Sequence, residues 1–395
     1  MITVVGCDGG PLPPAVRALL ADATLVVGAA RHLAQVDTAA ERLVMGSVAA
    51  AVERLSTHDG HAVVLASGDP GFFGIVATLR RAGLRPDVVA APSSVAHAFA
   101  RLGLPWDDAV VVSAHGRDLR RAVNVCRAHR KVAVLTAPGA GPHELAKELA
   151  DTSRRIVVAS RLGTPDERIT GPDGDWADPN VVLVLADGVP VGGAPGGDAG
   201  PSPRWVAGAQ PGPAGWALPE EAFDHRDSMI TKAEVRALVL ARLGPRLGDL
   251  VWDVGAGSGS VAVECARLGA AVVAVERDPD ACDRVRRNAA AFTVDVSVVH
   301  GSAPAVLAGL PAPDAVFVGG GGAAVLAGCL ERRPARVVAA YAAVERVGPA
   351  LSALTGAGYR AGGTQMQANR IAPLPGGVHR LEATNPVYVV WGERS

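Results

Sequence analysis

The chain has 395 residues, and at roughly 150 residues per domain this length predicts two or three domains. Lys and Arg together number 38 and Asp and Glu together number 39, a formal net charge of −1 that argues against nucleic acid as a partner. Hydrophobic residues make up 49% of the chain and charged residues 19%, so there is ample material for folded cores.

The sequence also argues against a membrane protein and against a disulfide scaffold. No apolar run reaches about 18 residues, so we expect no membrane span. The start, MITVVGCDGG, has no signal-peptide features, so we expect a cytoplasmic protein. The five cysteines are scattered and form no CxxC pair, so we predict neither a disulfide framework nor a bound metal.

The first half alternates short apolar, β-branched runs with longer Ala-, Leu- and Arg-rich runs of helical period. The predicted strands span residues 2–5, 25–27, 62–66, 88–90, 110–113, 131–135, 155–160 and 181–185. The predicted helices span residues 13–21, 48–55, 74–81, 94–102, 119–128 and 142–148.

A segment rich in Gly and Pro separates the two halves. Of the 30 residues 190–219, 15 are Gly or Pro, a composition that sustains neither a helix nor a strand. We predict a linker over residues 190–219, with Trp205 and Trp216 docked on a neighbouring surface. The predicted domains are therefore residues 1–189 and 220–395.

The second half shows the same alternation. The predicted strands span residues 250–254, 271–275, 295–300, 315–318, 336–340, 358–367 and 387–391. The predicted helices span residues 232–243, 260–268, 279–291 and 344–355, and Thr231 with Glu234 matches a capping box at the first of them. Such alternation predicts an α/β fold of parallel sheets covered by helices, with ligands at the carboxyl ends of the strands.

The strongest local signal is a glycine-rich turn between a predicted strand and a predicted helix. It reads Asp253-Val254-Gly255-Ala256-Gly257-Ser258-Gly259-Ser260, and its glycines permit a tight turn and a close approach of the backbone to a ligand. The next predicted strand leads into Glu276, where a carboxylate can accept hydrogen bonds from a ribose diol. A dinucleotide and S-adenosylmethionine both suit this arrangement, and Asp253 with the tighter glycine spacing favours S-adenosylmethionine.

Further motifs in this half occur in a fixed order: residues 229–236, 253–260, 276–278, 301–304, 313–322 and 385–388. Together they resemble the decarboxylating methyltransferase domain of cobalamin biosynthesis, which acts on C-15 of the precorrin macrocycle and has a Rossmann-like class I methyltransferase fold. By this resemblance the S-adenosylmethionine site is lined by Thr231, Asp253, the loop from Gly255 to Ser260, Glu276, Ser302 and Ala303. Residues 340–345 depart from the family pattern, which usually begins with Asn and contains Thr.

The first half carries a different set of motifs, at residues 4–6, 67–74, 91–94, 114–117 and 160–167. They resemble the tetrapyrrole methylase family, particularly its precorrin C-5 methylating member. This resemblance implies a two-lobed α/β fold that binds S-adenosylmethionine between its lobes, with Gly6, Asp69 and Ser94 at the site. The first loop departs from the family's G-x-G-P-G-G, and we interpret Cys7 there as a tolerated substitution rather than a nucleophile.

Three side chains are candidates for polar contacts with the substrate. His115 follows a predicted strand, where capping of the loop is the alternative. Arg161 can bind a carboxylate through two parallel hydrogen bonds, and an ion pair with Asp166 or Glu167 is the alternative. Asp227 lies in a polar segment that either contacts substrate carboxylates or caps the following helix.

The fusion of these two halves resembles the bifunctional decarboxylating precorrin methyltransferases. It implies methylation of a precorrin at C-5 by the first domain. It also implies methylation at C-15, with loss of the ring C acetate carboxyl, by the second domain. We expect the protein to form a homo-oligomer. Two alternatives stay open: methylation of another substrate such as RNA, and a half that binds tetrapyrrole or S-adenosylmethionine without turnover.

Overall fold

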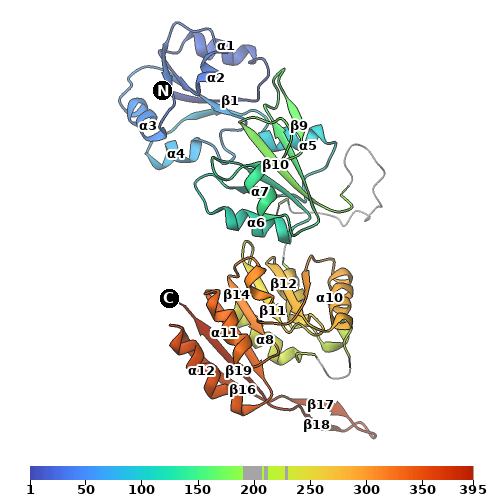
Figure 1. Ribbon diagram of the computed structural model, residues 1–395. Coiled ribbons are helices and arrows are strands. Elements are labelled where there is room, and N and C mark those ends of the chain that lie inside the picture. The colour runs from blue at the N-terminus through green and yellow to red at the C-terminus, as the bar shows by residue number, and fades with distance from the viewer. Residues whose placement is uncertain (190–206, 209–211, 227–229, 395) are drawn as a thin grey trace. The chain divides into compact units, whose positions relative to one another are not determined.

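The computed structural model describes residues 1–189, 207–208, 212–226 and 230–394 (Figure 1). The chain divides into two compact units: unit 1 comprises residues 1–117 and 131–209, and unit 2 comprises residues 118–130 and 210–395. Most of the predicted linker, Trp205 included, lies outside the described residues. Trp216 is described and is 60% exposed, so its predicted docking on a neighbouring surface is wrong.

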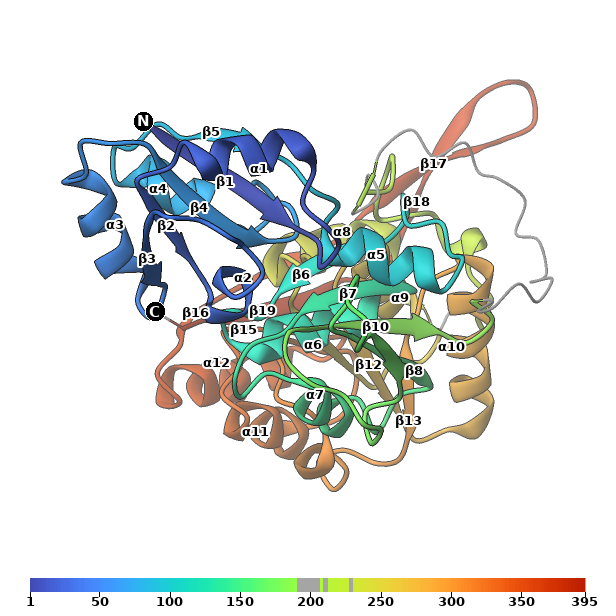
Figure 2. The ribbon, with the colours of Figure 1, turned by 90° about the horizontal axis from the view of Figure 1, so that it is seen from above.

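The first sheet of unit 1 is entirely parallel, with strand order β3-β2-β4-β1-β5 (Figure 2). Its strands are β1 (Ile2–Cys7), β2 (Leu25–Gly28), β3 (Glu41–Val44), β4 (Ala62–Ser67) and β5 (Asp87–Val89). Helices α1 (Pro14–Ala21) and α2 (Ala30–Leu33) cover one face, and α3 (Val48–Ser56) and α4 (Val76–Arg81) cover the other. Because both faces are buried at its centre, the strands β1, β2 and β4 are nearly continuous apolar runs, as the sequence predicts.

The second sheet of unit 1 is mixed, so the prediction of parallel sheets is wrong here. Its order is β6-β7-β10-β8-β9, and only β6 and β7 are parallel. The strands are β6 (Val110–Ser113), β7 (Lys131–Leu135), β8 (Arg154–Ser160), β9 (Arg168–Thr170) and β10 (Asn180–Ala186), and α5 (Ser94–Arg101) and α7 (Pro142–Glu148) belong to the same unit. No helix separates β8, β9 and β10, and parallel neighbours would require such a crossover.

Unit 2 is built on a seven-stranded sheet of order β13-β12-β11-β14-β15-β19-β16, in which only β19 runs antiparallel to its neighbours. The strands are β11 (Leu250–Val254), β12 (Ala271–Glu276), β13 (Ser297–His300), β14 (Ala315–Val318), β15 (Arg336–Tyr341), β16 (Arg360–Met366) and β19 (Val387–Glu393). The strand order reverses between β11 and β14, where open α/β sheets bind ligands. The predicted Rossmann-like fold is confirmed.

Helices cover both faces of this sheet. Along β11, Leu250, Trp252 and Val254 pack on one side and Val251 on the other, because successive side chains of a strand point to opposite faces. The first face meets α11 (Ala323–Glu331) and α12 (Val347–Gly356). The second meets α8 (Ala233–Leu243), α9 (Ser260–Arg267) and α10 (Pro279–Ala291). Unit 2 also contains α6 (Leu119–Ala128) and the short helices η1 (Glu220–Ala222), η2 (Leu307–Gly309) and η3 (Val344–Arg346).

Some elements were not predicted from the sequence. Helix α11 follows directly after four glycines, which hide its start. Strands β17 (Asn369–Pro373) and β18 (His379–Ala383) form a separate hairpin, in which Ile371 and Leu381 pair directly and are 73% and 70% exposed. The short strands β3 and β9 and the one-turn helix α2 were also missed.

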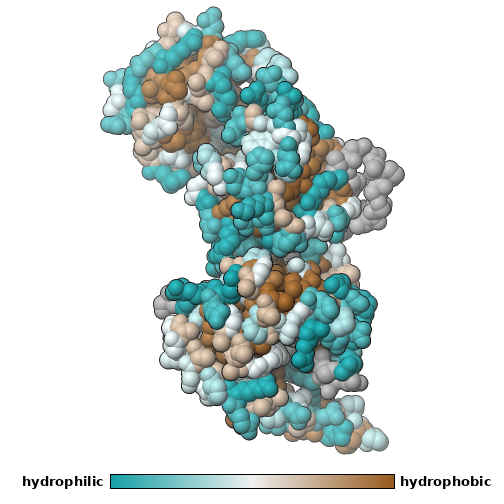
Figure 3. All heavy atoms as spheres, in the orientation of Figure 1, coloured by the Kyte–Doolittle hydropathy of each residue, from teal (hydrophilic) through white to brown (hydrophobic). Residues whose placement is uncertain are grey.

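The side of the molecule drawn in Figure 3 shows the surface of many of the described residues. The side seen in Figure 3 mixes hydrophilic and hydrophobic residues over both units. Among the helices of the described residues, none combines the length and the apolar character needed to cross a bilayer.

Candidate functional site

A glycine-rich loop joins β11 to α9 in unit 2, where the strand order reverses. Gly255 has a φ of 79°, a left-handed value that favours glycine. A Cβ added at Gly255 would stand 3.0 Å from the backbone nitrogen of Gly320, in the loop after β14. A larger residue at 255 would therefore push these two loops apart.

Glu276, the last residue of β12, organises the same loop. Its Oε2 accepts a hydrogen bond from the backbone N–H of Gly257 at 2.9 Å. Its Oε1 accepts from the backbone N–H groups of Arg277 and Asp278 at 2.8 and 3.0 Å. The carboxylate therefore lies beside the glycine loop at the carboxyl ends of β11 and β12, with acceptor capacity left for a ligand hydroxyl.

Asp253 lies behind the loop. It is buried in β11, its Oδ2 accepts from the backbone N–H of Ala262 at 2.9 Å, and its Oδ1 has no partner among the described residues. Burial raises the pKa of this carboxyl to about 7, and the charge of Glu276 adds to the increase. Asp253 therefore ties β11 to the first turn of α9 and fixes the loop between them.

A cavity of about 490 Å³ opens over the glycine loop. This volume lies within the range of about 300–1,000 Å³ that is typical of small-molecule sites. Apolar side chains make much of its wall: Ile230, Val235, Val261, Phe317 and Tyr341. The cavity is thus suited to a ligand that is partly apolar and is also in contact with exposed backbone groups.

The structure brings some of the predicted residues into this cavity and leaves others outside its lining. Those that line it are Thr231, Gly255, Ala256, Gly257 and Ser258. Those outside the lining are Asp253, Gly259, Ser260, Glu276, Ser302 and Ala303. Among the other lining residues, Lys232, Gly319 and Asn385 fall in motifs that the sequence analysis names, and Ala342 falls in the stretch that departs from the family pattern, whereas Thr384 lies outside all of them.

The predicted capping box at the start of α8 is wrong. Lys232 is the N-cap residue and no side chain caps the helix. Glu234 instead pairs with Arg370 of β17, with 2.8 Å between Oε2 and Nη2. Arg370 also pairs with Glu220 at 2.7 Å and lowers the pKa of that carboxyl to about 2. These ion pairs hold β17, the first strand of the hairpin, against η1 and the start of α8. Residues at the start of α8 and just before it line the cavity.

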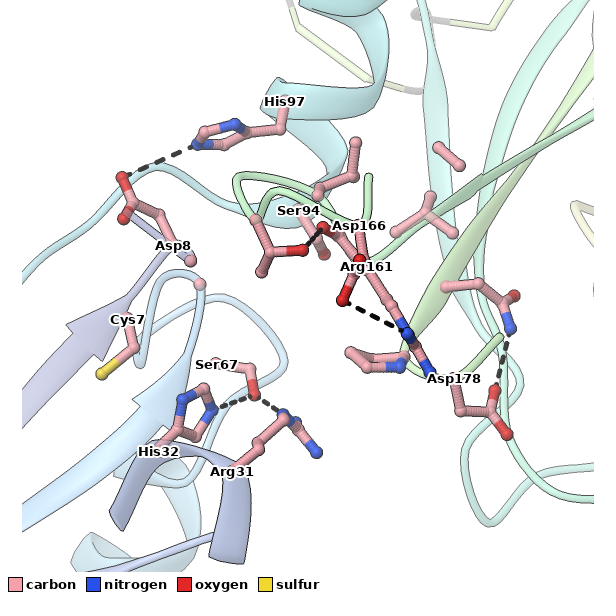
Figure 4. A pocket seen from close by; sticks show the side chains of 18 of the residues that line it. Cys7, Asp8, Arg31, His32, Ser67, Ser94, His97, Arg161, Asp166 and Asp178 are labelled. Atoms are coloured by element: carbon pink, nitrogen blue, oxygen red, sulfur yellow. Dashed lines mark hydrogen bonds and ion pairs between the residues drawn. The ribbon is translucent and has the colours of Figure 1, made fainter. Parts of the chain in front are cut away.

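Unit 1 contains a second cavity, of about 460 Å³, lined by residues of both its sheets (Figure 4). One wall is formed at the carboxyl ends of β1, β2 and β4, and the other by residues around β8 and β10. A Cβ added at Gly6 would stand 2.5 Å from the carbonyl oxygen of Gly68 and 2.7 Å from the nitrogen of Ala91. The end of β1 and the loops after β4 and β5 therefore pack backbone against backbone at this wall.

Of the residues predicted for this half, Ser94 and Arg161 line the cavity. Arg161 forms the ion pair considered as the alternative, at 3.6 Å from Asp166. Gly6 lies behind the wall, and Asp69 caps its own turn by accepting from the backbone N–H of Gly71 at 2.8 Å.

The other two catalytic candidates are not placed in a cavity. His115 is exposed after β6, outside the lining, and its backbone N–H donates to the Ser113 hydroxyl at 3.3 Å. Asp227 lies outside the described residues. Both remain predictions.

Sequence reasoning missed a polar cluster on the first wall of this cavity. The Arg31 Nη2 donates to Ser67 Oγ at 2.7 Å, and His32 Nε2 lies 2.9 Å from the same oxygen. Burial and then the Arg31 charge lower the pKa of His32 to about 4, so its ring is neutral at pH 7. Arg31 and His32 follow β2, and the rule that ligands bind at the carboxyl ends of parallel strands could have identified them.

Cys7 lines the same cavity. Burial, followed by the charge of Asp8, raises the pKa of its thiol to about 11. A thiol that stays protonated at neutral pH is a poor nucleophile, which supports the interpretation of Cys7 as a tolerated substitution. In the part of the chain that the structure describes, no three His, Cys, Asp or Glu side chains are grouped to hold a metal ion.

Comparison with known proteins places both halves. Residues 2–174 match the tetrapyrrole (corrin/porphyrin) methylases, and residues 221–392 match the precorrin methyltransferase domain. The precorrin-6Y C(5,15)-methyltransferase (decarboxylating) of Sinorhizobium sp is 37% identical over 81% of this chain and 78% of that protein. The chain belongs to the precorrin-6Y C(5,15)-methyltransferase (decarboxylating) family.

A second relative agrees with this membership. The Mycobacterium tuberculosis protein of the same name is 35% identical over 85% of this chain and 84% of that protein. The C-terminal domain of the Rhodobacter capsulatus precorrin-6Y C5,15-methyltransferase is 36% identical over 45% of this chain and 97% of that one, with a TM-score of 0.40. The chain is a methyltransferase of cobalamin biosynthesis that uses a methyl donor, and the predicted family and enzyme class are confirmed.

Proposed function

We propose that this member of the family methylates precorrin-6Y at C-5 and C-15 and removes the ring C acetate carboxyl, giving precorrin-8X. S-adenosylmethionine is the methyl donor at both positions. Residues 1–189 carry out the C-5 methylation, and residues 220–395 carry out the C-15 methylation and the decarboxylation. The observation that carries this proposal is that each half holds its own ligand-sized cavity at the carboxyl ends of parallel strands.

The residues around the unit 2 cavity fit S-adenosylmethionine. The Glu276 carboxylate lies just outside the cavity lining and accepts from three backbone N–H groups, one of them that of the lining residue Gly257, and in this proposal it also accepts hydrogen bonds from the ribose diol. The backbone of Gly255 and Gly257 lines the cavity and can contact the amino acid moiety closely. When bound, S-adenosylmethionine supplies an electrophilic methyl group on its sulfonium.

The remaining wall of this cavity combines apolar and polar side chains, which suits a ring system that carries polar substituents. Tyr341 lines it and also lines an adjoining cavity of about 140 Å³. Burial raises the pKa of the Tyr341 hydroxyl, so it stays protonated and can donate to a substrate oxygen. Thr384 and Asn385 also line the cavity, so Tyr341 and these two side chains can together orient the macrocycle.

These residues act chiefly by positioning. A reduced tetrapyrrole offers electron-rich meso carbons, so the protein needs no covalent intermediate. Holding the reacting carbon in line with the methyl group can contribute about 7–11 kcal/mol to the barrier reduction. The apolar side chains of Val261 and Phe317 limit hydration of the cavity, and a less hydrated acetate loses carbon dioxide more readily. The conjugated macrocycle accepts the electron pair that the leaving carbon dioxide releases.

Mass spectrometry of the full-length protein with precorrin-6Y and S-adenosylmethionine tests this function. We expect a product that has gained two methyl groups and lost one carbon dioxide. Binding of both ligands without any change in the mass of the precorrin would support the alternative of a binding module. Gain of one methyl group only would overturn the assignment of one half.

A further inference from the structure

The cavity of unit 1 has cationic side chains on two opposite walls. Figure 4 shows Arg31, His32 and Ser67 grouped on one side, and Arg161 with Asp166 on the other. Arg31 and His32 belong to α2, directly after β2, and Ser67 ends β4. The two walls therefore come from the two different sheets of the unit.

The two arginines differ in what balances their charge. Arg161 is paired with a carboxylate, since its Nη1 lies 3.6 Å from Asp166 Oδ2. Arg31 makes its hydrogen bond to a neutral hydroxyl, and no carboxylate of the described residues forms an ion pair with it. Its side chain is exposed to the cavity. Arg31 is thus a guanidinium whose charge is not neutralised by its neighbours within the described ranges.

The neighbours of Arg31 hold it in place without neutralising it. A guanidinium only donates, so Ser67 Oγ accepts from Arg31 Nη2. The same oxygen contacts the buried ring of His32, which is neutral at pH 7 and adds no second charge. The other titratable groups on this wall are the protonated thiol of Cys7 and the carboxylate of Asp8, which lies 3.8 Å from His97 Nε2. Most N–H donors of Arg31 are left for a ligand.

We propose that Arg31 is the carboxylate-binding residue of the unit 1 cavity, with Ser67 and His32 fixing the direction of its guanidinium. The inference rests on the proposed function, because two substrates with carboxylates would meet at this cavity. One is the precorrin, through an acetate or propionate side chain, and the other is the methyl donor, through its methionine carboxylate. An arginine fork matches either carboxylate through two parallel hydrogen bonds.

Steady-state kinetics of full-length variants test this role. Arg31→Gln keeps a donor for Ser67 and removes the charge, and Arg31→Lys keeps the charge without the fork. Arg17→Gln is the matched control, because Arg17 is exposed on α1, carries the same charge and does not line the cavity. Each reaction is followed by mass spectrometry, which separates methyl gain without carbon dioxide loss from the decarboxylating step. The affinity for S-adenosylhomocysteine is measured by calorimetry.

We expect Arg31→Gln to raise the KM for one carboxylate substrate of the non-decarboxylating methylation by about 10- to 100-fold. Arg31→Lys recovers part of the loss, Arg17→Gln behaves as wild type, and the decarboxylating step is unchanged in all three. A raised KM for precorrin-6Y with unchanged S-adenosylhomocysteine affinity assigns the macrocycle carboxylate. Weaker S-adenosylhomocysteine binding assigns the methionine carboxylate.

Two other outcomes separate the failure of this inference from the failure of the proposed function. If the wild type performs both methylations and Arg31→Gln alters neither KM nor the calorimetric affinity, Arg31 binds no carboxylate and the function stands. If the wild type itself shows no methyl transfer to precorrin-6Y, the proposed function fails, and the inference fails with it. Loss of the decarboxylating step in Arg31→Gln would indicate general damage and would also overturn the inference.

Discussion

Glu276→Gln tests whether the unit 2 loop is a methyl-donor site. The carboxylate accepts from Gly257 through one oxygen and from Arg277 and Asp278 through the other, at 2.8 to 3.0 Å. Glutamine has one acceptor oxygen in place of two. If that oxygen keeps the hydrogen bonds from the backbone N–H groups of Arg277 and Asp278, the side-chain NH₂ group faces the N–H of Gly257, and two donors then oppose each other.

The size of the effect follows from these contacts. A hydrogen bond to a charged group contributes about 1.5–3 kcal/mol, which corresponds to roughly 10- to 150-fold in affinity. The variant also loses the charged acceptor for the ribose diol. We therefore expect the unit 2 site to bind S-adenosylhomocysteine at least about tenfold more weakly.

Calorimetric titration of the full-length protein with S-adenosylhomocysteine measures this change. The unit 1 site serves as the internal reference, and one of two binding events is expected to weaken. Glu331→Gln is the matched control, because Glu331 is exposed at the end of α11, away from both cavities. Two unchanged binding events in Glu276→Gln would refute the role given to Glu276.

Two further predictions concern stability. The pKa of Asp253 rises from 3.8 to about 7 on folding, so wild-type stability falls as the pH rises through that window. In Asp253→Asn this dependence of stability on pH should disappear, and the free energy of unfolding at pH 8 should be up to about 4 kcal/mol higher than in the wild type. Urea unfolding at pH 4.5 and pH 8 measures both effects; a pH dependence equal to that of the wild type would contradict the burial argument. Arg370→Ala leaves Glu220, whose side chain is 6% exposed, without its cation, and should cost about 1–3 kcal/mol at pH 7. Because folding lowers the pKa of Glu220 from 4.5 to about 2, this contribution is present above pH 4.5 and is lost as the pH falls toward 2, so equal losses at pH 7 and pH 2 would argue against the ion pair.

The local features of unit 2 could be predicted because short segments determine them. The apolar run into Gly255 and the acid at Glu276 belong to one strand–loop–helix–strand unit, and the structure brings them together through the Gly257 N–H. The parallel strand pairs next to β11 could be predicted for the same reason, since β11, β12 and β14 are each followed by a helix. The sequence predicts Asp253 at the cofactor site, but whether this side chain faces a ligand or a helix depends on packing that the spacing does not specify, and in the structure its Oδ2 accepts from the backbone N–H of Ala262 in α9.

The features that escaped prediction depend on contacts far apart in the sequence. Strand β10 lies between β7 and β8 and is antiparallel to both. The sequence of each strand does not reveal this pairing, because an antiparallel strand buried on both faces has the same apolar character as a parallel one. Glu234 has the spacing of a capping residue, yet Arg370, more than 130 positions later, takes its carboxylate. Arg31 follows an ordinary strand, and its unbalanced charge becomes visible only when Ser67 and the opposite sheet are placed around it.

We propose that the chain has two separate methyl-transfer sites, one in each unit. The most direct test uses S-adenosylmethionine with a ¹³C-labelled methyl group and NMR of the tetrapyrrole product. Gly6→Val should lose the label at C-5, because its side chain meets the backbone of Gly68 and Ala91, and Gly255→Val should lose the label at C-15 with the decarboxylation. An equimolar mixture of the two variants should restore the doubly labelled product. A mixture that fails to restore it, although both variants have wild-type thermal stability, would contradict the existence of two independent sites.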